Sequence, residues 1–270
     1  MIKKISKKLF NFNKILKDLE NKGFSRIKNY KSEEKCLKTI KVLETILSLR
    51  IKKSEFVGNS NNQVLYNYFI EFPDLLDFVY DENIFKLMSK VLDEDHVLTS
   101  TSARNKRILK TLEKSSGTSG IGWHTDTRYV FQNKVPVKPS LSYIVIFLLE
   151  DFTKENAATQ FVPYSHKFNF RPERNKAYET DFFIGKKGDI FILDTSLFHK
   201  AGVSSIKSRW AIFSMYSSWF IKPYFQFDKM FKKKELESLN PELKQLFHCN
   251  SIPPKNHRKN RATLKRVQNK

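Results

Sequence analysis

The spacing of hydrophobic residues changes character near residue 96. Before that point, the apolar residues of three stretches recur at helical spacing, and one short strand is predicted between the first two. Gly23 is a candidate C-cap of the first helix and Ser32 a candidate N-cap of the second, and Pro73 opens a new helix rather than interrupting one. The predicted helices are 2–19, 32–50 and 66–92, and the strand is 23–30.

Beyond residue 96, short segments rich in β-branched and aromatic residues alternate with Gly, Ser and Asn turns. A helical front followed by many short strands predicts a mainly β, α+β fold, a sandwich or barrel with the N-terminal helices packed on one side. We expect a single domain over 1–228, mostly helical over 1–95 and β over 96–228, followed by a basic, helical or disordered tail over 229–270. The predicted strands are 96–112, 139–151, 159–166, 188–199 and 208–220.

Composition places the chain among globular proteins, since 40% of its 270 residues are hydrophobic and 14% aromatic. The net charge of +21 is concentrated at the two ends: residues 1–55 hold 16 Lys/Arg against 6 Asp/Glu, residues 229–270 hold 12 against 3, and residues 56–228 hold 21 against 19. The basic ends fit either an anionic partner or the lysine-rich composition of an AT-rich genome. The first helix could lie on an anionic membrane, but packing on its own domain is the favoured interpretation.

Cellular location is indicated by the cysteines and by the hydropathy. Cys36 and Cys249 lie far apart and form no CxxC motif, so neither a disulfide framework nor a cysteine zinc site is expected, and a reducing cytoplasm fits best. No apolar run approaches the ~20 residues that span a bilayer. Charges interrupt the apolar residues at the start of the chain, so we expect no secretory signal there.

A histidine and an aspartate stand two apart in the stretch GWHTDTR, residues 122–128. Alternate side chains of a strand share one face, so His124 and Asp126 are predicted to project together. His199, at the end of an alternating segment, is the natural third ligand. Two histidines and one carboxylate are typical of non-haem Fe(II) oxygenases, which keep positions open for a chelating cosubstrate and O2. The alternative is a hydrogen-bonded His–Asp pair that only holds a turn.

Arg209 opens a predicted strand ten residues after His199. A strand that returns antiparallel beside the one bearing His199 would carry Arg209 into the same cavity. A buried arginine needs an anion, and its planar fork suits a carboxylate. The distal carboxylate of 2-oxoglutarate is that anion if the other end of this molecule chelates the iron. Pairing with an acidic neighbour such as Asp194 is the alternative.

Four segments together resemble the phytanoyl-CoA dioxygenase family of Fe(II)/2-oxoglutarate oxygenases. In chain order they are LKDLENKGFSRIKNYKSEE, GWHTD, LLEDFTKENAATQFVPYSH and GDIFILDTSLFHKAGVSSIKSRWAIF. HxD alone is a weak motif, but the ordered set is specific. The resemblance implies a double-stranded β-helix (a cupin-like jelly roll) and Arg209 paired with 2-oxoglutarate. It also implies iron held by three ligands: His124, Asp126 and His199.

The chain departs from the family pattern at two turns. Ala157 follows Asn156 where the family has Asn-Gly, and Tyr164 stands in Pro-Tyr-Ser-His where the family has glycine. These losses cost conformational freedom and are expected to reshape the loop over the site. His166 closes the second turn and is predicted to be structural. Asp126 argues against halogenation, because the related halogenases replace that carboxylate.

Other side chains are candidates for binding cosubstrate and substrate. Ser142 and Tyr143 stand where the family often supplies a side chain to 2-oxoglutarate; they point to opposite faces, so at most one contacts it, and Tyr143 is preferred. Arg128 lies on the cavity side if its strand continues. With Arg104 and Arg107 on the preceding strand, it could clamp an anionic substrate, although a solvated arginine is the simpler alternative.

The sequence therefore predicts a dioxygenase that uses Fe(II), 2-oxoglutarate and O2. Its expected reaction is hydroxylation of an unactivated C–H bond in a small organic substrate, with release of succinate and CO2; an anionic substrate is the case in which the arginines would act as a clamp. Two alternatives come from other classes of protein. One is a protein that binds nucleic acid or an anionic surface through its basic termini, and the other is a zinc hydrolase with the same three ligands. A hydrolase would leave Arg209 without a purpose.

Overall fold

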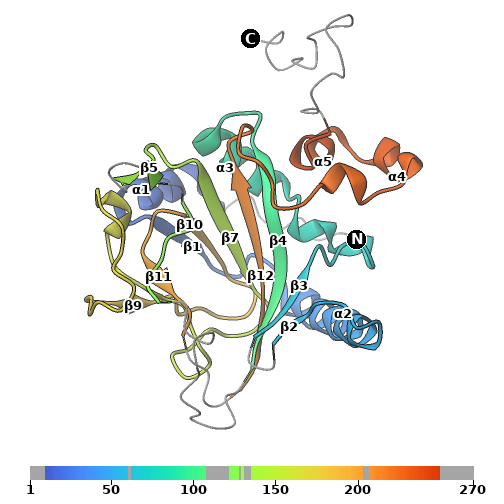
Figure 1. The fold of residues 1–270 in the computed structure, drawn as a ribbon, viewed down its shortest axis with the longest axis horizontal. Coiled ribbons are helices and arrows are strands. Elements are labelled where there is room, and N and C mark those ends of the chain that lie inside the picture. The colour runs from blue at the N-terminus through green and yellow to red at the C-terminus, as the bar shows by residue number, and fades with distance from the viewer. Residues whose placement is uncertain are drawn as a thin grey trace, which may run out of the picture.

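The computed structural model describes residues 10–59, 62–107, 122–127, 129–130, 135–202 and 207–249. Within these residues a seven-stranded sheet and a three-stranded sheet, both antiparallel throughout, provide the framework of the molecule. We call them the main sheet and the small sheet. In Figure 1, β7, β12 and β4 of the main sheet stand at the centre, with β11 and β9 of the small sheet to their left.

In sheet order, the strands of the main sheet are β1 (Phe24–Ile27), β10 (Ile190–Asp194), β7 (Ser142–Leu148), β12 (Arg209–Ser217), β4 (Val97–Lys106), β3 (Asn62–Tyr66) and β2 (Gly58–Asn59). The small sheet holds β11 (His199–Lys200), β8 (Gln160–Phe161) and β9 (Asp181–Phe182), and a separate pair is formed by β5 (Tyr129–Val130) and β6 (Val135–Pro136). The α-helices are α1 (Phe12–Lys22), α2 (Glu33–Lys52), α3 (Glu82–Leu92), α4 (Lys233–Ser238) and α5 (Pro241–Leu246). Short 3-10 turns are η1 (Pro73–Phe78), η2 (Ser165–Lys167) and η3 (Phe227–Lys229).

The central strands of the main sheet are buried on both faces, which explains why β7 and β10 are apolar without alternation. In β7, Val145 and Phe147 contact the helices, whereas Ile146 and Leu148 belong to a second core that includes Phe161 of the small sheet. The helices therefore cover one face of the main sheet, and the small sheet approaches the other. This arrangement confirms the predicted double-stranded β-helix with helices on one side.

The ends of the N-terminal helices follow the sequence signals. Gly23 ends α1 with a left-handed φ of 80°, and the side chain of Ser32 accepts a hydrogen bond from the backbone of α2. Ile15 and Leu19 of α1 are buried in the main core, so packing on the domain is confirmed for this helix; residues 1–9 lie outside the described part. None of the described helices is both long and apolar enough to cross a bilayer.

The predicted helix over 66–92 is wrong at its start. Tyr66 ends β3, whose register pairs Val64 with Arg104 of β4, and the residues between β3 and Pro73 form turns. Sheet pairing supplies the backbone hydrogen bonds there, and Tyr68 and Phe69 are buried without helical structure. Pro73 then opens η1 as predicted.

The chain beyond residue 228 begins as part of the same packed body. Leu246 and Phe247 are fully buried in the main core, where the ring of Phe247 lies 5.4 Å from those of Phe69 and Phe227. The first part of the expected tail, residues 229–249, is thus anchored against the helical face. The remainder, 250–270, lies outside the described residues.

The segment 188–199, expected as one strand, is divided between the two sheets. Its first part, β10, pairs with β7, and its last residue begins β11, which pairs with β8. The turn between them is held by Asp194, whose Oδ1 accepts hydrogen bonds from the backbone N–H of Ser196 and the hydroxyl of Ser140. Arg209 consequently lies on β12, between β7 and β4, and not beside the strand of His199 as expected.

Gly188, just before β10, is the glycine whose replacement tests this framework most simply. Its φ is +86°, its carbonyl accepts from the backbone N–H of Lys31, and an added Cβ would lie 2.3 Å from the Lys31 carbonyl oxygen. We expect Gly188→Ala to lower the free energy of unfolding by ~2 kcal/mol or more, measured by urea denaturation. Ser48→Ala, on the exposed side of α2, should change the free energy of unfolding by less than ~0.5 kcal/mol. Equal losses in both variants would show that position 188 does not require glycine.

Candidate active site

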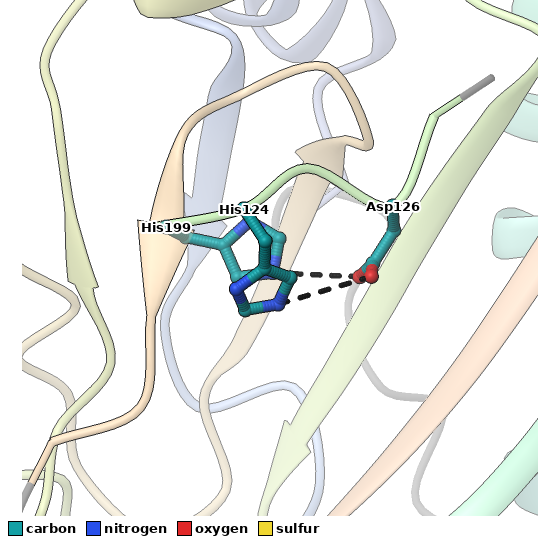
Figure 2. A group of neighbouring side chains, drawn as sticks. All are labelled: His124, Asp126 and His199. Carbon is teal, nitrogen blue, oxygen red and sulfur yellow. Dashed lines mark ion pairs between the residues drawn. The ribbon is translucent and has the colours of Figure 1, made fainter. Parts of the chain in front are cut away.

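Two histidines from distant parts of the chain are joined through their backbones. The N–H of His124 donates to the carbonyl of His199 (3.1 Å), and the N–H of His199 donates back to the carbonyl of His124 (3.0 Å). This isolated antiparallel bridge extends the small sheet by one residue and brings the two imidazole rings to a centroid distance of 4.3 Å. Figure 2 shows both rings turned toward the carboxylate of Asp126.

Backbone carbonyls orient both rings in the same way. The Nδ1 atoms of His124 and His199 lie 3.0 and 2.9 Å from the carbonyl oxygens of Gly122 and Leu197, two residues earlier in each case. A carbonyl can only accept, so each Nδ1 carries a proton, and in the neutral ring Nε2 is the atom with a lone pair for a metal. The Nε2 atoms lie 3.9 and 3.4 Å from the Asp126 carboxylate, and one potential ligand atom of each residue lies within 4.8 Å of the others.

These three side chains fit a divalent transition-metal ion. Imidazole Nε2 with Nδ1–H bonded to a carbonyl is the usual state of a metal-bound histidine. The backbone N–H of Asp126 donates to the Thr195 carbonyl (2.9 Å), which fixes the carboxylate relative to the rings. Two imidazoles and one carboxylate on one side of an ion leave its opposite side open.

Interactions with the two histidines keep the Asp126 carboxylate ionised. Burial alone would raise the pKa of Asp126, but the hydrogen bond with His199 and the nearby charges lower it to about 2. Burial alone would likewise lower the pKa of His199, and the contact with Asp126 reverses this, so that its pKa is raised. The pKa of His124 is lowered by burial and by His199. The three groups thus form one coupled cluster whose anionic member is charged at neutral pH.

Arg209 is held in a socket of backbone carbonyls. Its side chain is almost fully buried, its Nε donates to the carbonyl of Asn156 (2.9 Å), and its Nη2 donates to that of Ala157. The guanidinium lies 3.6 Å from the centroid of the Phe152 ring. Burial lowers the pKa of Arg209 to about 9, and Glu150 opposes this only in part.

No carboxylate among the described residues forms an ion pair with Arg209. The alternative partner Asp194 is engaged in the turn after β10. The carboxylate of Glu150 instead accepts a hydrogen bond from the backbone N–H of Trp210 (2.8 Å). A buried guanidinium bound only by neutral carbonyls retains an unmatched charge, and its remaining N–H groups can donate hydrogen bonds to an anion in the cavity.

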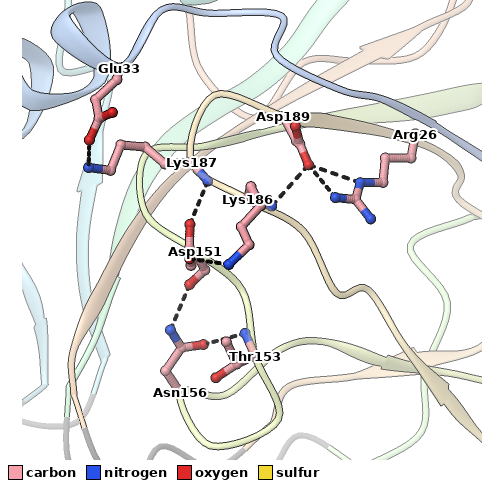
Figure 3. A network of polar contacts seen from close by, with 8 residues as sticks. All are labelled: Arg26, Glu33, Asp151, Thr153, Asn156, Lys186, Lys187 and Asp189. Carbon is pink, nitrogen blue, oxygen red and sulfur yellow. Dashed lines mark hydrogen bonds and ion pairs between the residues drawn. The ribbon is translucent and has the colours of Figure 1, made fainter.

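The socket itself rests on Asn156 (Figure 3). The buried Asn156 side chain donates to the Asp151 carbonyl (2.6 Å) and accepts from the backbone N–H of Thr153 (2.8 Å), which closes the loop. Asp151 in turn accepts hydrogen bonds from Lys186 and Lys187 before β10. The loop that supplies the two carbonyls to Arg209 is therefore held internally by Asn156, and through Asp151 it is hydrogen-bonded to the residues that precede β10 of the main sheet.

A single cavity of about 300 Å³ contains both the histidine–aspartate cluster and Arg209. Its apolar wall includes Ile144, Ile146 and Leu193 of the main sheet. Two further cations, Arg104 and Lys106, line it from β4. The cluster comes from the small-sheet side and the three cations from the main sheet, so the cavity lies between the two sheets.

Comparison with known proteins agrees with this geometry. The family model of phytanoyl-CoA dioxygenase (PhyH) matches residues 19–211, well over half of the chain. The chain belongs to the phytanoyl-CoA dioxygenase family. A curated relative, dioxygenase af480 of Aspergillus fumigatus, is 28% identical over 145 residues, which are 50% of this chain and 45% of af480. The match thus spans less than half of that relative.

Solved structures share the fold of this phytanoyl-CoA dioxygenase family member. HygX from Streptomyces hygroscopicus, solved with nickel and 2-oxoglutarate, superposes with a TM-score of 0.63 at 14% identity and covers 78% of this chain and 89% of its own. The epimerase SnoN, solved with Fe3+, alpha-ketoglutarate and nogalamycin RO, gives 0.59 at 12% identity, covering 78% and 86%. At these identities the likeness establishes the fold alone.

The family's glycine positions keep a glycine-like backbone in this chain. Ala157 and Tyr164 have φ values of 70° and 61°, in the left-handed region that costs a non-glycine residue about 1–2 kcal/mol. At Ala157 this conformation accompanies a carbonyl that accepts from Arg209, so the strained residue belongs to the arginine socket. His166 is structural as predicted: its Nε2 lies 3.0 Å from the Glu20 carbonyl near the end of α1.

The predicted cosubstrate residues on β7 are corrected by the strand's orientation. Ile144 and Ile146 line the cavity, so Tyr143 faces the opposite side, where it packs against the helical core. The sequence favours Tyr143 over Ser142 as the residue that contacts the cosubstrate, and this preference is wrong, because Tyr143 points away from the cavity. Ser142 faces the cavity side, but its Oγ is bonded to Thr195 Oγ1 (2.7 Å) beside Asp126.

Of the three arginines predicted to clamp a substrate, the structure brings one to the site. Arg104 lines the cavity, Arg107 is exposed at the end of β4 and does not line it, and Arg128 lies outside the described residues. The sequence interpretation overlooked Lys106. Alternate residues share a face, so a cavity position at Arg104 selects Lys106 and excludes Arg107.

The loop closure by Asn156 predicts a loss of stability when its amide is removed. Asn156→Ala removes a fully buried amide and leaves the Asp151 carbonyl and Thr153 N–H without their partner, so we expect the free energy of unfolding to fall by about 1–3 kcal/mol in chemical denaturation. The matched change Asn169→Ala, at an exposed position, should cost less than ~0.5 kcal/mol. An Asn156 variant as stable as the wild type would show that this loop does not depend on the amide.

Proposed function

We propose that this protein is an Fe(II)- and 2-oxoglutarate-dependent dioxygenase that hydroxylates an unactivated C–H bond of a small molecule. In the overall reaction, substrate, O2 and 2-oxoglutarate yield hydroxylated substrate, succinate and CO2. One observation carries the proposal: two oriented imidazoles, a carboxylate and a buried arginine without an acidic partner among the described residues share one cavity. Family membership and the metal and 2-oxoglutarate in the HygX structure support it.

The side chains would divide the work between the two sheets. His124, His199 and Asp126 would hold the iron, and iron with its 2-oxo acid supplies the oxidising chemistry. Arg209 would bind the distal carboxylate of 2-oxoglutarate. Lys106 is its direct cross-strand partner and would add a second cation there. Burial, Arg209 and Arg104 lower the pKa of Lys106, and an anion beside it would raise this pKa again.

Hydroxylation is the simplest outcome of this arrangement, because it requires only that a C–H bond be held at the open side of the metal. The SnoN structure is that of an epimerase, so the fold by itself does not select the reaction. A zinc hydrolase would use the same three ligands but gives no role to a buried Arg209. Binding of the basic termini to an anionic partner stays a prediction from the sequence.

Formation of the metal–cosubstrate complex tests the proposal directly. Anaerobic addition of Fe(II) and 2-oxoglutarate to the metal-free protein should produce a weak visible charge-transfer band, and succinate should form when air is admitted. His124→Ala should abolish the band, because it removes one ligand. Arg209→Ala should raise the 2-oxoglutarate concentration for half-formation roughly a hundredfold, since charge-assisted hydrogen bonds are lost.

Arg107→Ala is the matched control for Arg209→Ala, because Arg107 is exposed and outside the cavity. It should shift half-formation less than about twofold. A folded wild-type protein that forms no band, or a band that survives in His124→Ala, would refute the proposed function.

A further inference from the structure

The cavity carries more positive charge than its proposed cofactors neutralise. Its described lining residues include three cations, Arg104, Lys106 and Arg209, and one acid, Asp126. A ferrous ion and a 2-oxoglutarate dianion would cancel each other, so two positive charges would stay in excess. Arg209 is buried and Lys106 half-buried, whereas Arg104 is exposed to solvent where it lines the cavity, so its charge is open to an anionic group that enters from outside.

Arg104 is the one of these three cations to which the proposed function gives no contact with 2-oxoglutarate. Lys106 and Arg209 face each other across β4 and β12, whereas Arg104 lies one cavity-facing position further along β4, opposite Ala211. Asp126 adjoins Met215, which pairs with Ser100 nearer the start of β4, whereas Arg209 pairs with Lys106 at the end of this strand. Arg104 is thus located between the cosubstrate anchor and the proposed metal ligands.

The Arg104 side chain is held in place while its terminal nitrogens stay free. Its Nε donates to Ser102 Oγ (3.1 Å), and its guanidinium carbon lies 4.8 Å from the centroid of the Phe213 ring. Among the described residues no acid forms an ion pair with Arg104, and neither Nη1 nor Nη2 makes a hydrogen bond to them. A stacked guanidinium with both terminal nitrogens open is preorganised to bind an oxyanion in two-pronged geometry.

We infer that Arg104 binds an anionic group of the substrate, a carboxylate or a phosphate, beside the metal site. This inference rests on the proposed function, because that function assigns Arg209 and Lys106 to 2-oxoglutarate. The apolar neighbours Ile144, Ile146 and Phe213 suit the hydrocarbon part next to the anion. An anchor on Arg104 fixes one end of the substrate, so the C–H bond that reacts lies close to its anionic group.

The test compares near-isosteric probes with and without negative charge. Benzoate, phenyl phosphate and the neutral benzamide are titrated into the anaerobic Fe(II)–2-oxoglutarate complex at 0.15 M salt, and binding is measured by ligand-observed NMR. At least one of the two anions should bind about tenfold or more tightly than benzamide, as expected for charge-assisted hydrogen bonds. Which anion binds better distinguishes a carboxylate substrate from a phosphate one.

Two charge reversals on the same strand provide the control. Arg104→Glu should weaken binding of the preferred anion about tenfold or more, whereas Arg107→Glu, with the same change in net charge, should weaken it less than about twofold. If Arg104→Glu is not folded by circular dichroism, Arg104→Met replaces it, since methionine keeps apolar contact with Phe213 and removes the charge.

Failure of this inference is distinguishable from failure of the proposed function. If the wild-type protein forms no charge-transfer band, the proposed function fails. If the band forms but benzamide binds as tightly as both anions, the substrate anchor alone is refuted. Equal losses from Arg104→Glu and Arg107→Glu would also refute it, because they would show a general field effect rather than a site.

Discussion

The reciprocal hydrogen bonds between the backbones of His124 and His199 are the constraint on which the rest of the site depends. They bind a segment that follows β4 to the strand that follows β10, and so fix two imidazoles at a centroid distance of 4.3 Å. The ring orientation is also set by backbone, through the carbonyls of Gly122 and Leu197. The ligand geometry thus belongs to the fold and not to side-chain packing alone, which is how a site keeps its shape before a metal binds.

The two sheets contribute opposite halves of the cavity. The small sheet supplies the histidines, and the main sheet supplies the row of cations on β4 and β12. The turn at Asp194 moves the chain from one sheet to the other, and the loop closed by Asn156 returns a pair of carbonyls to Arg209. Polar groups that look structural in isolation therefore set the distance and direction between the proposed metal ligands and Arg209.

The alternation of side chains along a strand predicts which residues point the same way, but not which face of a strand lines the cavity. His124 and Asp126 are two residues apart, and their common direction holds whatever sheet they join. The choice of face on β4 and β7 requires knowledge of which side the cavity occupies, so Arg107 and Tyr143 were selected where Lys106 and Ser142 share the cavity side.

Other errors have the same origin in tertiary context. The apolar run 188–199 contains no glycine or proline where it changes sheet, because the turn is held by side-chain oxygens of Asp194 and Ser140. The helical pattern before Pro73 reflects buried aromatic residues in turns beside β3. The fold class and the helix caps at Gly23 and Ser32 depend on local signals, and these predictions are confirmed.

A crystal structure of the protein soaked anaerobically with Fe(II) and 2-oxoglutarate would test the central claim most directly. We expect an anomalous iron peak about 2.0–2.2 Å from Nε2 of both His124 and His199 and from an oxygen of Asp126. We also expect that the far carboxylate of 2-oxoglutarate contacts the guanidinium of Arg209. Iron bound elsewhere, or a 2-oxoglutarate molecule that does not reach Arg209, would contradict the central claim.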